Sequence, residues 1–220
     1  NLGYSTGDDP RRVFENRRRF AAAVSVDIDH GVVCGQVHGA EVAAITRGDR
    51  GEGVHRPSER WRGRDVVVID EEGVFALAIT ADCPLVVVVD PVARALGVAH
   101  AGWRGTAVGA VEALLTALAD RGAEPGRSWA AIAPSIRACC YPVGPEVFDT
   151  LEGRAGLDEA RRADRLDLPT LHRHTLLGWG VDPRRLRIED DCTGCGRARY
   201  FSHRCEGPTG RSGCWVGWRT

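Results

Sequence analysis

Four short apolar runs follow one another between residues 65 and 100, and no other feature limits the possible folds as strongly. The runs cover residues 65–70, 74–80, 85–90 and 95–100, and acidic residues, glycine or proline separate them. Short runs rich in Val and Ile with turn residues at both ends are typical of β-strands. Turns this short predict antiparallel or mixed pairing, because a parallel crossover needs about a dozen residues or more. The runs are almost continuously apolar, so we expect one sheet that is covered on both faces.

Helical patterns surround these strands. Asp9 followed by Pro10 predicts a helix start, because an Asp side chain caps the first turn and proline fits into it. A second helix is predicted by apolar residues that share one face at helical spacing, namely Val108, Val111, Leu114, Leu115 and Leu118. Further helices are expected over 145–151 and 168–179, and further strands over 31–37, 41–46, 128–133 and 186–189. This mixture predicts an α/β or α+β class, and the absence of a compositional break predicts a single domain over residues 1–220.

The composition argues against several classes of protein. The chain has 29 basic and 30 acidic residues among its 220, so it lacks the basic excess of a nucleic-acid binder. No apolar run approaches the roughly 18 residues of a membrane span. The first residues do not resemble a signal segment. We therefore expect a cytoplasmic protein with neither nucleic acid nor membrane as a partner, while the oligomeric state stays open.

Three potential metal ligands lie at the ends of predicted strands, each close to glycine or proline. They are His38, Cys83 and His100. Side chains at strand ends are held by the sheet yet remain reachable by a ligand. Two imidazoles and one thiolate suit Zn²⁺, and three protein ligands leave a fourth position open for water, as in catalytic zinc sites. Their spacing forms no local metal motif, so a buried cysteine with two hydrogen-bonded histidines is the alternative.

A resemblance to a known family covers nearly the whole chain. It is carried by the motifs QVHG at 36–39, TADCP at 80–84, AHAGWRG at 99–105, IAPSIRACCYPVGPEV at 132–147, and CT, YFSHR and GPTGR between 192 and 211. In this order the motifs resemble the bacterial laccase-like family once described as multicopper polyphenol oxidases. Its members are now described as zinc-dependent purine nucleoside phosphorylases with adenosine deaminase activity.

The resemblance implies both a site and a fold. It implies that His38, Cys83 and His100 bind Zn²⁺ and that purine nucleosides and phosphate are the substrates. It also implies two mixed sheets sandwiched between helices, an αββα arrangement shared with a group of cysteine hydrolases. We expect the family's short N-terminal segment to be missing here, and residues 202–205 replace its usual aromatic-Arg-Arg. Multicopper chemistry fits poorly with seven histidines, although copper has a high affinity for any His/Cys site.

Four further residues are candidates for catalysis or substrate binding. Arg104, flanked by glycine near a predicted helix start, is expected either to bind phosphate or to satisfy loop carbonyls. Asp82 is a candidate general base, a partner for a ligating histidine, or simply a turn cap. Tyr141 is a candidate for stacking on a purine, with ordinary packing as the alternative. Arg204 is a second candidate for phosphate binding.

Eight cysteines are many for this length. Cys192 and Cys195 form a CxxC motif, and Cys205 and Cys214 follow it. Four thiolates are a candidate for a second, structural zinc site, although strong zinc ribbons carry two CxxC pairs. Free thiols or a disulfide are the alternatives. For the adjacent cysteines at 139–140 we expect one buried and one half-exposed thiol, in preference to a redox pair.

Three other functions stay open beside the purine nucleoside enzyme. In a Cys/His hydrolase or deamidase, Cys83 would be the nucleophile and a histidine its base. A copper-dependent polyphenol oxidase is the second alternative. The third is a non-enzymatic metal-binding or peptidoglycan-linked accessory protein, which would bind zinc without turning over any nucleoside.

Overall fold

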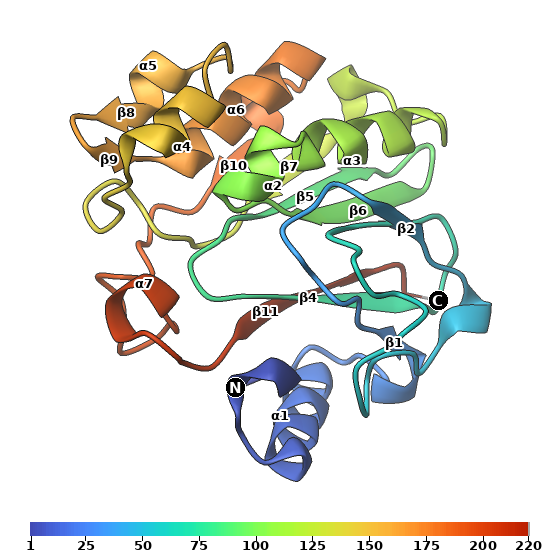
Figure 1. Ribbon diagram of the computed structural model, residues 1–220. Coiled ribbons are helices and arrows are strands. Elements are labelled where there is room, and N and C mark those ends of the chain that lie inside the picture. Colours follow the sequence, from blue (N-terminus) through green and yellow to red (C-terminus); the bar gives the residue numbers. More distant parts are fainter. Residues whose placement is uncertain (220) are drawn as a thin grey trace.

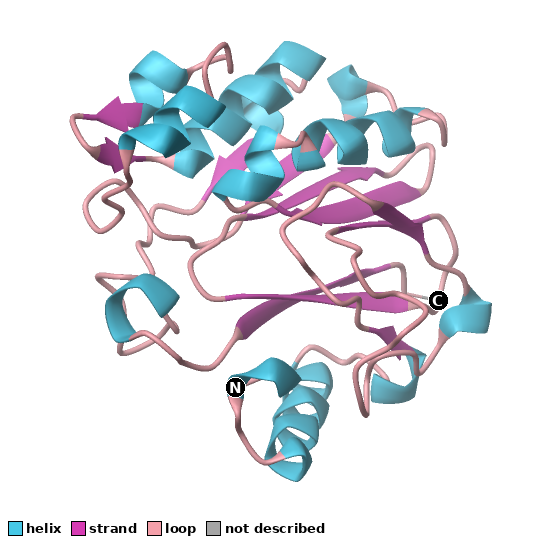
Figure 2. Ribbon diagram, viewed as in Figure 1, coloured by secondary structure: helices cyan, strands magenta, loops and turns pink. Residues whose placement is uncertain are grey.

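Two β-sheets lie face to face in the computed structural model, which describes residues 1–219. Helices cover the outer face of each sheet, which gives four layers (Figure 1; Figure 2). The larger sheet has six strands in the order β10-β7-β5-β6-β3-β2, and the smaller sheet has three in the order β1-β4-β11. Both sheets contain parallel and antiparallel pairs. The expected mixed class, with mixed sheets between helices, is confirmed.

The strands and helices are short. The strands are β1 (Gly31–Val32), β2 (Val42–Ala44), β3 (Val66–Ile69), β4 (Phe75–Thr80), β5 (Leu85–Asp90), β6 (Ala95–His100), β7 (Trp129–Ile132), β8 (Arg161–Arg162), β9 (Arg165–Leu166), β10 (Leu186–Ile188) and β11 (Ser212–Gly217). The helices are α1 (Pro10–Ala23), α2 (Trp103–Ala107), α3 (Ala110–Ala119), α4 (Pro145–Thr150), α5 (Leu157–Ala160), α6 (Leu168–Trp179) and α7 (His203–Glu206). Within residues 1–219, no helix combines the length and the apolar character that crossing a membrane requires.

The four apolar runs form β3, β4, β5 and β6, but they do not share one sheet. β3, β5 and β6 pair antiparallel in the larger sheet, whereas β4 lies in the smaller sheet between β1 and β11. The prediction of a single sheet was therefore wrong, because the partners of β4 come from distant parts of the chain and local spacing cannot reveal them. The chain crosses between the sheets on both sides of β4 (Figure 1). The second crossing, at 81–84, carries Cys83.

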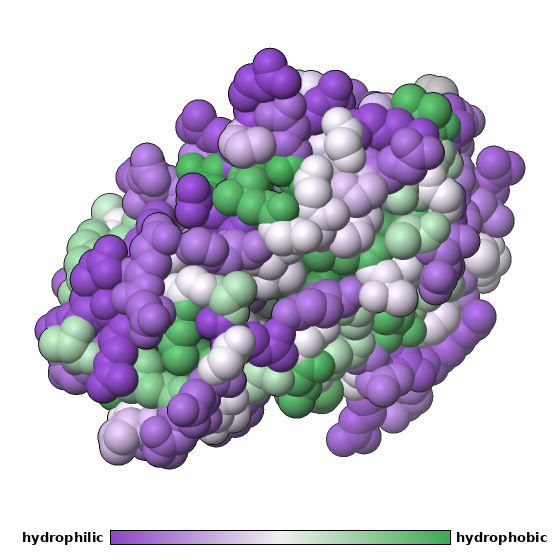
Figure 3. Space-filling view, turned by 90° about the horizontal axis from the view of Figure 1, so that it is seen from above, coloured by the Kyte–Doolittle hydropathy of each residue, from purple (hydrophilic) through white to green (hydrophobic). Residues whose placement is uncertain are grey.

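Both faces of β3 and β6 in the larger sheet are buried, as the continuous apolar runs predict, whereas Trp129 of β7 is 50% exposed. Along β3, Val66 and Val68 pack into the core shared with α3, while Val67 and Ile69 pack toward the smaller sheet. On the outer face of the smaller sheet, Leu77 of β4 packs with side chains of α1. Seen from above, the surface of the helical side is mainly hydrophilic, with small separate apolar patches (Figure 3). The apolar side chains thus lie mostly between the layers.

Helix boundaries follow local signals with one exception. The Asp9 side chain accepts a hydrogen bond from the Arg11 N–H at 2.9 Å, and α1 begins at Pro10 as predicted. Helix α6 covers the predicted residues 168–179. The helix expected to include Val108 is instead two helices, because Gly109 takes a left-handed φ of 83° between α2 and α3. Val108 is 60% exposed, so its predicted place on the buried face was wrong.

Strand lengths near the two termini differ from the predictions. β1 and β2 are shorter than expected because the residues between them turn toward the site described below. β11 was not predicted, since its two glycines and mixed polar and apolar side chains show no regular alternation. It pairs antiparallel with β4 over its whole length, and this pairing brings the C-terminal part of the chain beside the central turn.

Candidate metal centre and the adjoining cavity

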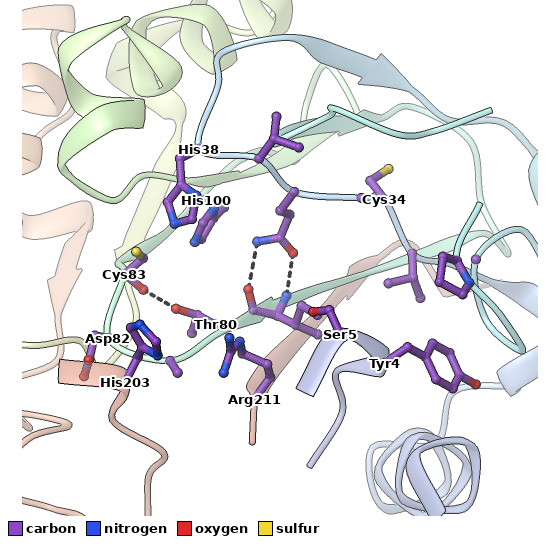
Figure 4. A pocket seen from close by; sticks show the side chains of 18 of the residues that line it. Tyr4, Ser5, Cys34, His38, Thr80, Asp82, Cys83, His100, His203 and Arg211 are labelled. Atoms are coloured by element: carbon purple, nitrogen blue, oxygen red, sulfur yellow. Dashed lines mark hydrogen bonds between the residues drawn. The ribbon is translucent and has the colours of Figure 1, made fainter. Parts of the chain in front are cut away.

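His38, Cys83 and His100 come together from three separate segments. His38 lies in the loop after β1, Cys83 in the turn between β4 and β5, and His100 at the end of β6. One potential ligand atom from each residue lies within 4.8 Å of the other two, and the two imidazole centroids are 4.9 Å apart. Figure 4 shows the three side chains converging. The structure thus places all three sequence-predicted ligands in one cluster.

Asp65 organises two of these three ligands. His100 Nδ1 lies 2.9 Å from Asp65 Oδ1, so the ring N–H donates to a carboxylate that is fully buried. The backbone N–H groups of Val37, His38 and Gly39 donate to the same carboxylate at 2.9, 2.8 and 2.8 Å. A carboxylate behind an imidazole fixes the tautomer and leaves the other ring nitrogen free for a metal. Asp65 therefore positions both the His100 ring and the His38 turn.

Two residues at the site hold backbone conformations that non-glycine residues rarely adopt. His38 has φ of 66° and Asp82 has φ of 89°. Such conformations cost on the order of 1–3 kcal/mol each and persist only where surrounding contacts hold them. Asp65 holds the His38 turn. The Asp82 turn is held by its own side chain, which accepts hydrogen bonds from Thr193 Oγ1 at 2.6 Å and from the Arg204 N–H at 2.7 Å.

The loop that carries His38 is also tied to the smaller sheet. Gln36 Nε2 donates to the Ile79 carbonyl at 2.8 Å, and Gln36 Oε1 accepts from the Ile79 N–H at 2.9 Å (Figure 4). The side-chain amide thereby replaces a backbone strand partner at the end of β4. These two hydrogen bonds join the His38 loop to the strand that leads into Cys83.

Gly102 provides the space that the Cys83 sulfur occupies. A Cβ atom at position 102 would lie 2.4 Å from Cys83 Sγ and 3.3 Å from His38 Cδ2. A real Cβ contact this short does not occur, so any larger residue would displace the sulfur. The glycine of the AHAGWRG motif is thus explained by close approach to the ligand cluster.

The cluster forms an ion pair when no metal is bound. Burial opposes ionisation of Cys83, but the His100 charge and hydrogen bonds from His100 and His38 lower the pKa of the thiol to about 6. Burial likewise opposes protonation of His100, but the Cys83 charge and the hydrogen bond to Asp65 raise the pKa of the imidazole to about 9. Near pH 7 the sulfur is therefore a thiolate, which is the form that binds metals.

A cavity of about 650 Å³ adjoins the three ligands, which form part of its wall. Its lining contains more basic than acidic side chains: the arginines are Arg17, Arg62, Arg104, Arg204 and Arg211, and the carboxylates are Glu59 and Asp82. Cavities of this size hold drug-sized or nucleoside-sized ligands. The excess of guanidinium groups favours a ligand with a negative charge.

The other predicted binding residues line the same cavity. Arg104 is exposed, and its guanidinium group stacks on the ring of Trp103 at 4.4 Å from the centroid. Arg204 lies over the ring of Tyr141 at 5.0 Å and donates to the Pro142 carbonyl at 3.0 Å. Burial raises the pKa of Tyr141 to about 12, so its hydroxyl stays protonated. All three side chains line the space that a ligand beside the cluster would occupy.

Asp82 lines the cavity too, but it does not support a ligating histidine as one prediction had it. That role belongs to Asp65, whose carboxylate receives the His100 N–H. Each Asp82 oxygen accepts one hydrogen bond, from Thr193 and from Arg204. A carboxylate has about four acceptor positions, so Asp82 retains capacity to accept a proton from a ligand.

A second group of side chains with metal-ligand geometry consists of Cys139, Cys140, Cys192 and Cys195. The predicted set was wrong in two members, Cys205 and Cys214. Cys214 lies on β11 opposite Ala78 and packs into the core between the sheets. The turns at 139–140 and 192–195 meet because β7 and β10 are parallel neighbours, so the segments that follow them leave the same edge of the sheet. Cys139 is exposed and Cys140 is half-buried, so neither is the fully buried thiol expected there.

Asp65, Thr193 and His203 are site residues that sequence reasoning missed. Asp65 and Thr193 act through long-range hydrogen bonds, for which the sequence carries no local signal. His203 is exposed on the cavity wall beside Asp82 (Figure 4). Its imidazole was the available signal, because histidine is the side chain that ordinarily titrates near neutral pH.

The donor set at His38, Cys83 and His100 fits a transition metal. Two imidazole nitrogens and a thiolate suit zinc or copper, whereas magnesium and calcium prefer oxygen ligands. The supporting carboxylate of Asp65 and the close approach of the Cys83 sulfur to Gly102 fit a metal ion held by these three side chains.

Known proteins resemble the chain over nearly all of its length. A purine nucleoside phosphorylase, YlmD of Geobacillus stearothermophilus, is 36% identical over 228 residues, covering 100% of this chain and 83% of that protein. An adenosine deaminase, RL5 of an unknown prokaryotic organism, is 31% identical and covers 93% of this chain and 80% of its own.

Solved structures agree with this likeness. The crystal structure of the hypothetical protein YfiH of Bacillus licheniformis superposes with a TM-score of 0.93 at 31% identity, covering 100% of this chain and 85% of that one. The YlmD structure from Geobacillus stearothermophilus gives 0.92 at 35%, with the same coverage. A family model described as multi-copper polyphenol oxidoreductase laccase matches residues 1–219. With motifs, fold and ligand cluster in agreement, the chain belongs to this laccase-like family.

Proposed function

We propose that this protein is a metal-dependent enzyme that splits purine nucleosides with phosphate and also deaminates adenosine. The observation that carries the proposal is a cluster of three metal-binding side chains that opens onto an arginine-rich cavity of about 650 Å³. The relatives named above as purine nucleoside phosphorylase and adenosine deaminase support both activities. The substrates would be adenosine, inosine, guanosine and methylthioadenosine.

The resident metal would be Zn²⁺ held by His38, Cys83 and His100. When bound, zinc supplies Lewis-acid activation of a polar group of the substrate or of water. Copper binds the same donors with higher affinity, so copper in a preparation would be weak evidence for an oxidase. Asp65 keeps His100 in the tautomer that ligation needs.

Phosphorolysis requires an anion site beside the sugar. Phosphate attacks the anomeric carbon, the bond from that carbon to the purine nitrogen breaks, and the purine leaves with the bonding electrons and accepts a proton. Arg104 and Arg204 line the cavity with guanidinium groups whose planar N–H donors match phosphate oxygens. Arg104 is the stronger candidate because Arg204 already donates to a backbone carbonyl.

The purine would lie against Tyr141, and Asp82 would act as the general base. Tyr141 offers a ring on the cavity wall, with Arg204 on one side of it. Asp82 lies next to Cys83 and keeps free acceptor positions. His203, on the same wall, is a further candidate for proton transfer. We also propose that residues 1–220 form one domain and that its layered fold is the one shared with cysteine hydrolases.

A nucleoside assay with product identification tests the proposed function. The protein is incubated with each nucleoside with and without phosphate, and the free base, the sugar phosphate and ammonia are measured separately. Elemental analysis of the same preparation gives metal per chain. We expect base and sugar phosphate in equal amounts only with phosphate, and ammonia from adenosine alone. Bound zinc with no turnover of any nucleoside would refute the proposal.

One arrangement favours a second candidate, a Cys/His hydrolase or deamidase. Asp65, His100 and Cys83 follow one another as carboxylate, imidazole and thiolate, which is the order found around catalytic cysteines. The second imidazole, from His38, has no place in such a triad but is the third ligand of a metal site. Zinc content separates the two candidates, because a stoichiometric zinc on Cys83 leaves no free nucleophile.

A further inference from the structure

The four sulfurs of Cys139, Cys140, Cys192 and Cys195 form a cluster, which we call the thiol cluster, away from the histidines of the first site. Each sulfur lies within 4.8 Å of the other three. Cys195 Sγ is 3.6 Å from Cys139 Sγ and 3.4 Å from Cys140 Sγ. Zn–S bonds of about 2.3 Å place tetrahedral sulfurs about 3.8 Å apart. The cluster therefore has the size of a four-thiolate zinc site before any metal is present.

The distances within the thiol cluster favour a shared ion over a disulfide. A disulfide brings two sulfurs to about 2.05 Å and excludes the others. Here Cys195 faces two sulfurs at similar distances, and all eight cysteines are free thiols. The backbone N–H of Arg137 also donates to Cys192 Sγ at 3.4 Å, a contact that stabilises charge on a ligating sulfur.

Positive charge is available beside the cluster. Four thiolates around Zn²⁺ carry a net charge of about −2, which needs compensation. Arg165 Nη1 donates to the Cys139 carbonyl at 2.8 Å, and Arg204 Nη1 donates to the Pro142 carbonyl at 3.0 Å. Both guanidinium groups thus lie on the turn that carries two of the ligands.

We propose that Cys139, Cys140, Cys192 and Cys195 bind a second Zn²⁺ as a closed, structural site. Four protein ligands leave no position for water or substrate, in contrast to the three ligands at the first site. Binding of Zn²⁺ releases the protons of those thiols that were not already ionised. The proposal does not depend on the function proposed above, since none of the four cysteines lines the cavity beside the first site.

The second ion would hold in place the turn that carries Cys83. Thr193, between two of the ligands, donates to Asp82 Oδ1 at 2.6 Å, and its N–H donates to the Ser135 carbonyl at 3.1 Å. The Ile136 N–H donates to the Asp82 carbonyl at 2.9 Å. The segments bearing the four sulfurs therefore both contact Asp82, whose φ of 89° needs support. The thiol cluster is a positioning device for the first site.

Metal counting in matched serine variants tests this proposal. The full-length protein, its Cys195→Ser variant and its Cys83→Ser variant are purified under reducing conditions with Zn²⁺, and zinc per chain is measured. We expect two ions in the parent, one in each variant and none in the double variant. Cys205→Ser is the matched control, because Cys205 is an exposed neighbour outside the cluster and should keep both ions.

A second readout identifies the ligands. Co²⁺ bound to the Cys83→Ser protein should give the intense sulfur-to-metal absorption of a four-thiolate site, and Cys195→Ser should abolish it. Cys195→Ser alone should lower the melting temperature and also lower nucleoside turnover, because the Asp82 turn loses support while the ligands of the first site remain in place. Unchanged zinc content in Cys195→Ser, loss of zinc in Cys205→Ser, or a disulfide among the four cysteines in the purified parent would overturn the proposal.

Discussion

The two cysteine-containing clusters of this protein use similar atoms in opposite settings. The cluster of His38, Cys83 and His100 combines one sulfur with two imidazoles, has a carboxylate behind it and opens onto a large cavity. The thiol cluster has four sulfurs, lies near the surface and has no imidazole. In the two roles proposed above, ligand number and surroundings distinguish a reactive metal site from a structural one, whereas the presence of cysteine does not.

The pKa values of the cysteines also differ between the two clusters. The imidazole of His100 lowers the pKa of Cys83 to about 6 despite burial. In the thiol cluster, burial and hydrogen bonds from neighbouring sulfurs raise the pKa of Cys139 to about 11. The pKa of Cys140 is raised as well, for the same reasons. Without metal, the first cluster already holds a thiolate, whereas Cys139 and Cys140 remain neutral thiols. Within the thiol cluster the pKa of Cys192 is lowered despite burial, because backbone N–H groups such as that of Arg137 donate to its sulfur.

The largest effect is expected from Cys83→Ser. A serine hydroxyl is not ionised near pH 7, and two neutral imidazoles are too few donors to hold zinc. Both phosphorolysis and deamination should fall by more than about 100-fold, because loss of even an outer partner costs 10–100-fold. Activity and metal at this site are measured together. A variant that keeps its zinc here but loses activity would make Cys83 a nucleophile, and one that loses zinc but keeps activity would make the metal structural.

Asp65→Asn should lower the metal affinity of the first cluster and leave that of the thiol cluster unchanged. The amide can no longer receive the His100 N–H and three backbone N–H groups as a charged acceptor, so metal affinity should fall about 10–100-fold. Competition with a chelator measures the affinity. Asp90→Asn is the matched control, since Asp90 is also buried and accepts three backbone N–H groups far from either cluster. Equal metal affinity in Asp65→Asn and the parent would refute the positioning role.

The pH dependence of thiol labelling compares the clusters directly. In metal-free protein, the lowered pKa means that Cys83 is ionised above pH 6 and protonated below it. Its iodoacetamide labelling should therefore rise through a midpoint near pH 6. At pH 7 it should be about threefold faster than for an ordinary cysteine, because a larger thiolate fraction outweighs the lower nucleophilicity of a low-pKa thiolate. Peptide mass spectrometry follows each residue. Cys139, exposed but with a raised pKa, is the internal comparison and should label slowly at pH 7. A Cys83 midpoint above pH 8 would contradict the thiolate.

Local pattern predicted those parts of the molecule that depend on neighbouring residues. Helix α6 and the positions of Cys83 and His100 next to strand ends follow from periodicity and turn residues, whereas His38 lies in a loop beyond the end of β1. The motif resemblance singled out these three as ligands. The place of β4 in the smaller sheet and the hydrogen bonds of Asp65 depend on contacts between distant segments. Only two of the four cysteines in the thiol cluster, Cys192 and Cys195, were among the predicted ligands of a second metal. The CxxC at 192–195 is local, but its partners at 139–140 arrive through the pairing of β7 with β10.

The smallest effect is expected from replacing the exposed Arg104. It tests whether the arginines beside the two clusters have different roles. Arg104 stacks on Trp103 at the cavity, whereas Arg165 supports the turn of the thiol cluster. Because an exposed guanidinium is screened by water and salt, Arg104→Ala should raise the KM for phosphate only about fivefold, with the melting temperature unchanged. The effect should shrink as ionic strength rises, because salt screens the attraction between the guanidinium group and phosphate. Arg165→Ala, which removes the same charge beside the other cluster, should leave the phosphate KM unchanged. A phosphate dependence unaltered by Arg104→Ala would move the anion site to Arg204 or to another arginine of the cavity wall.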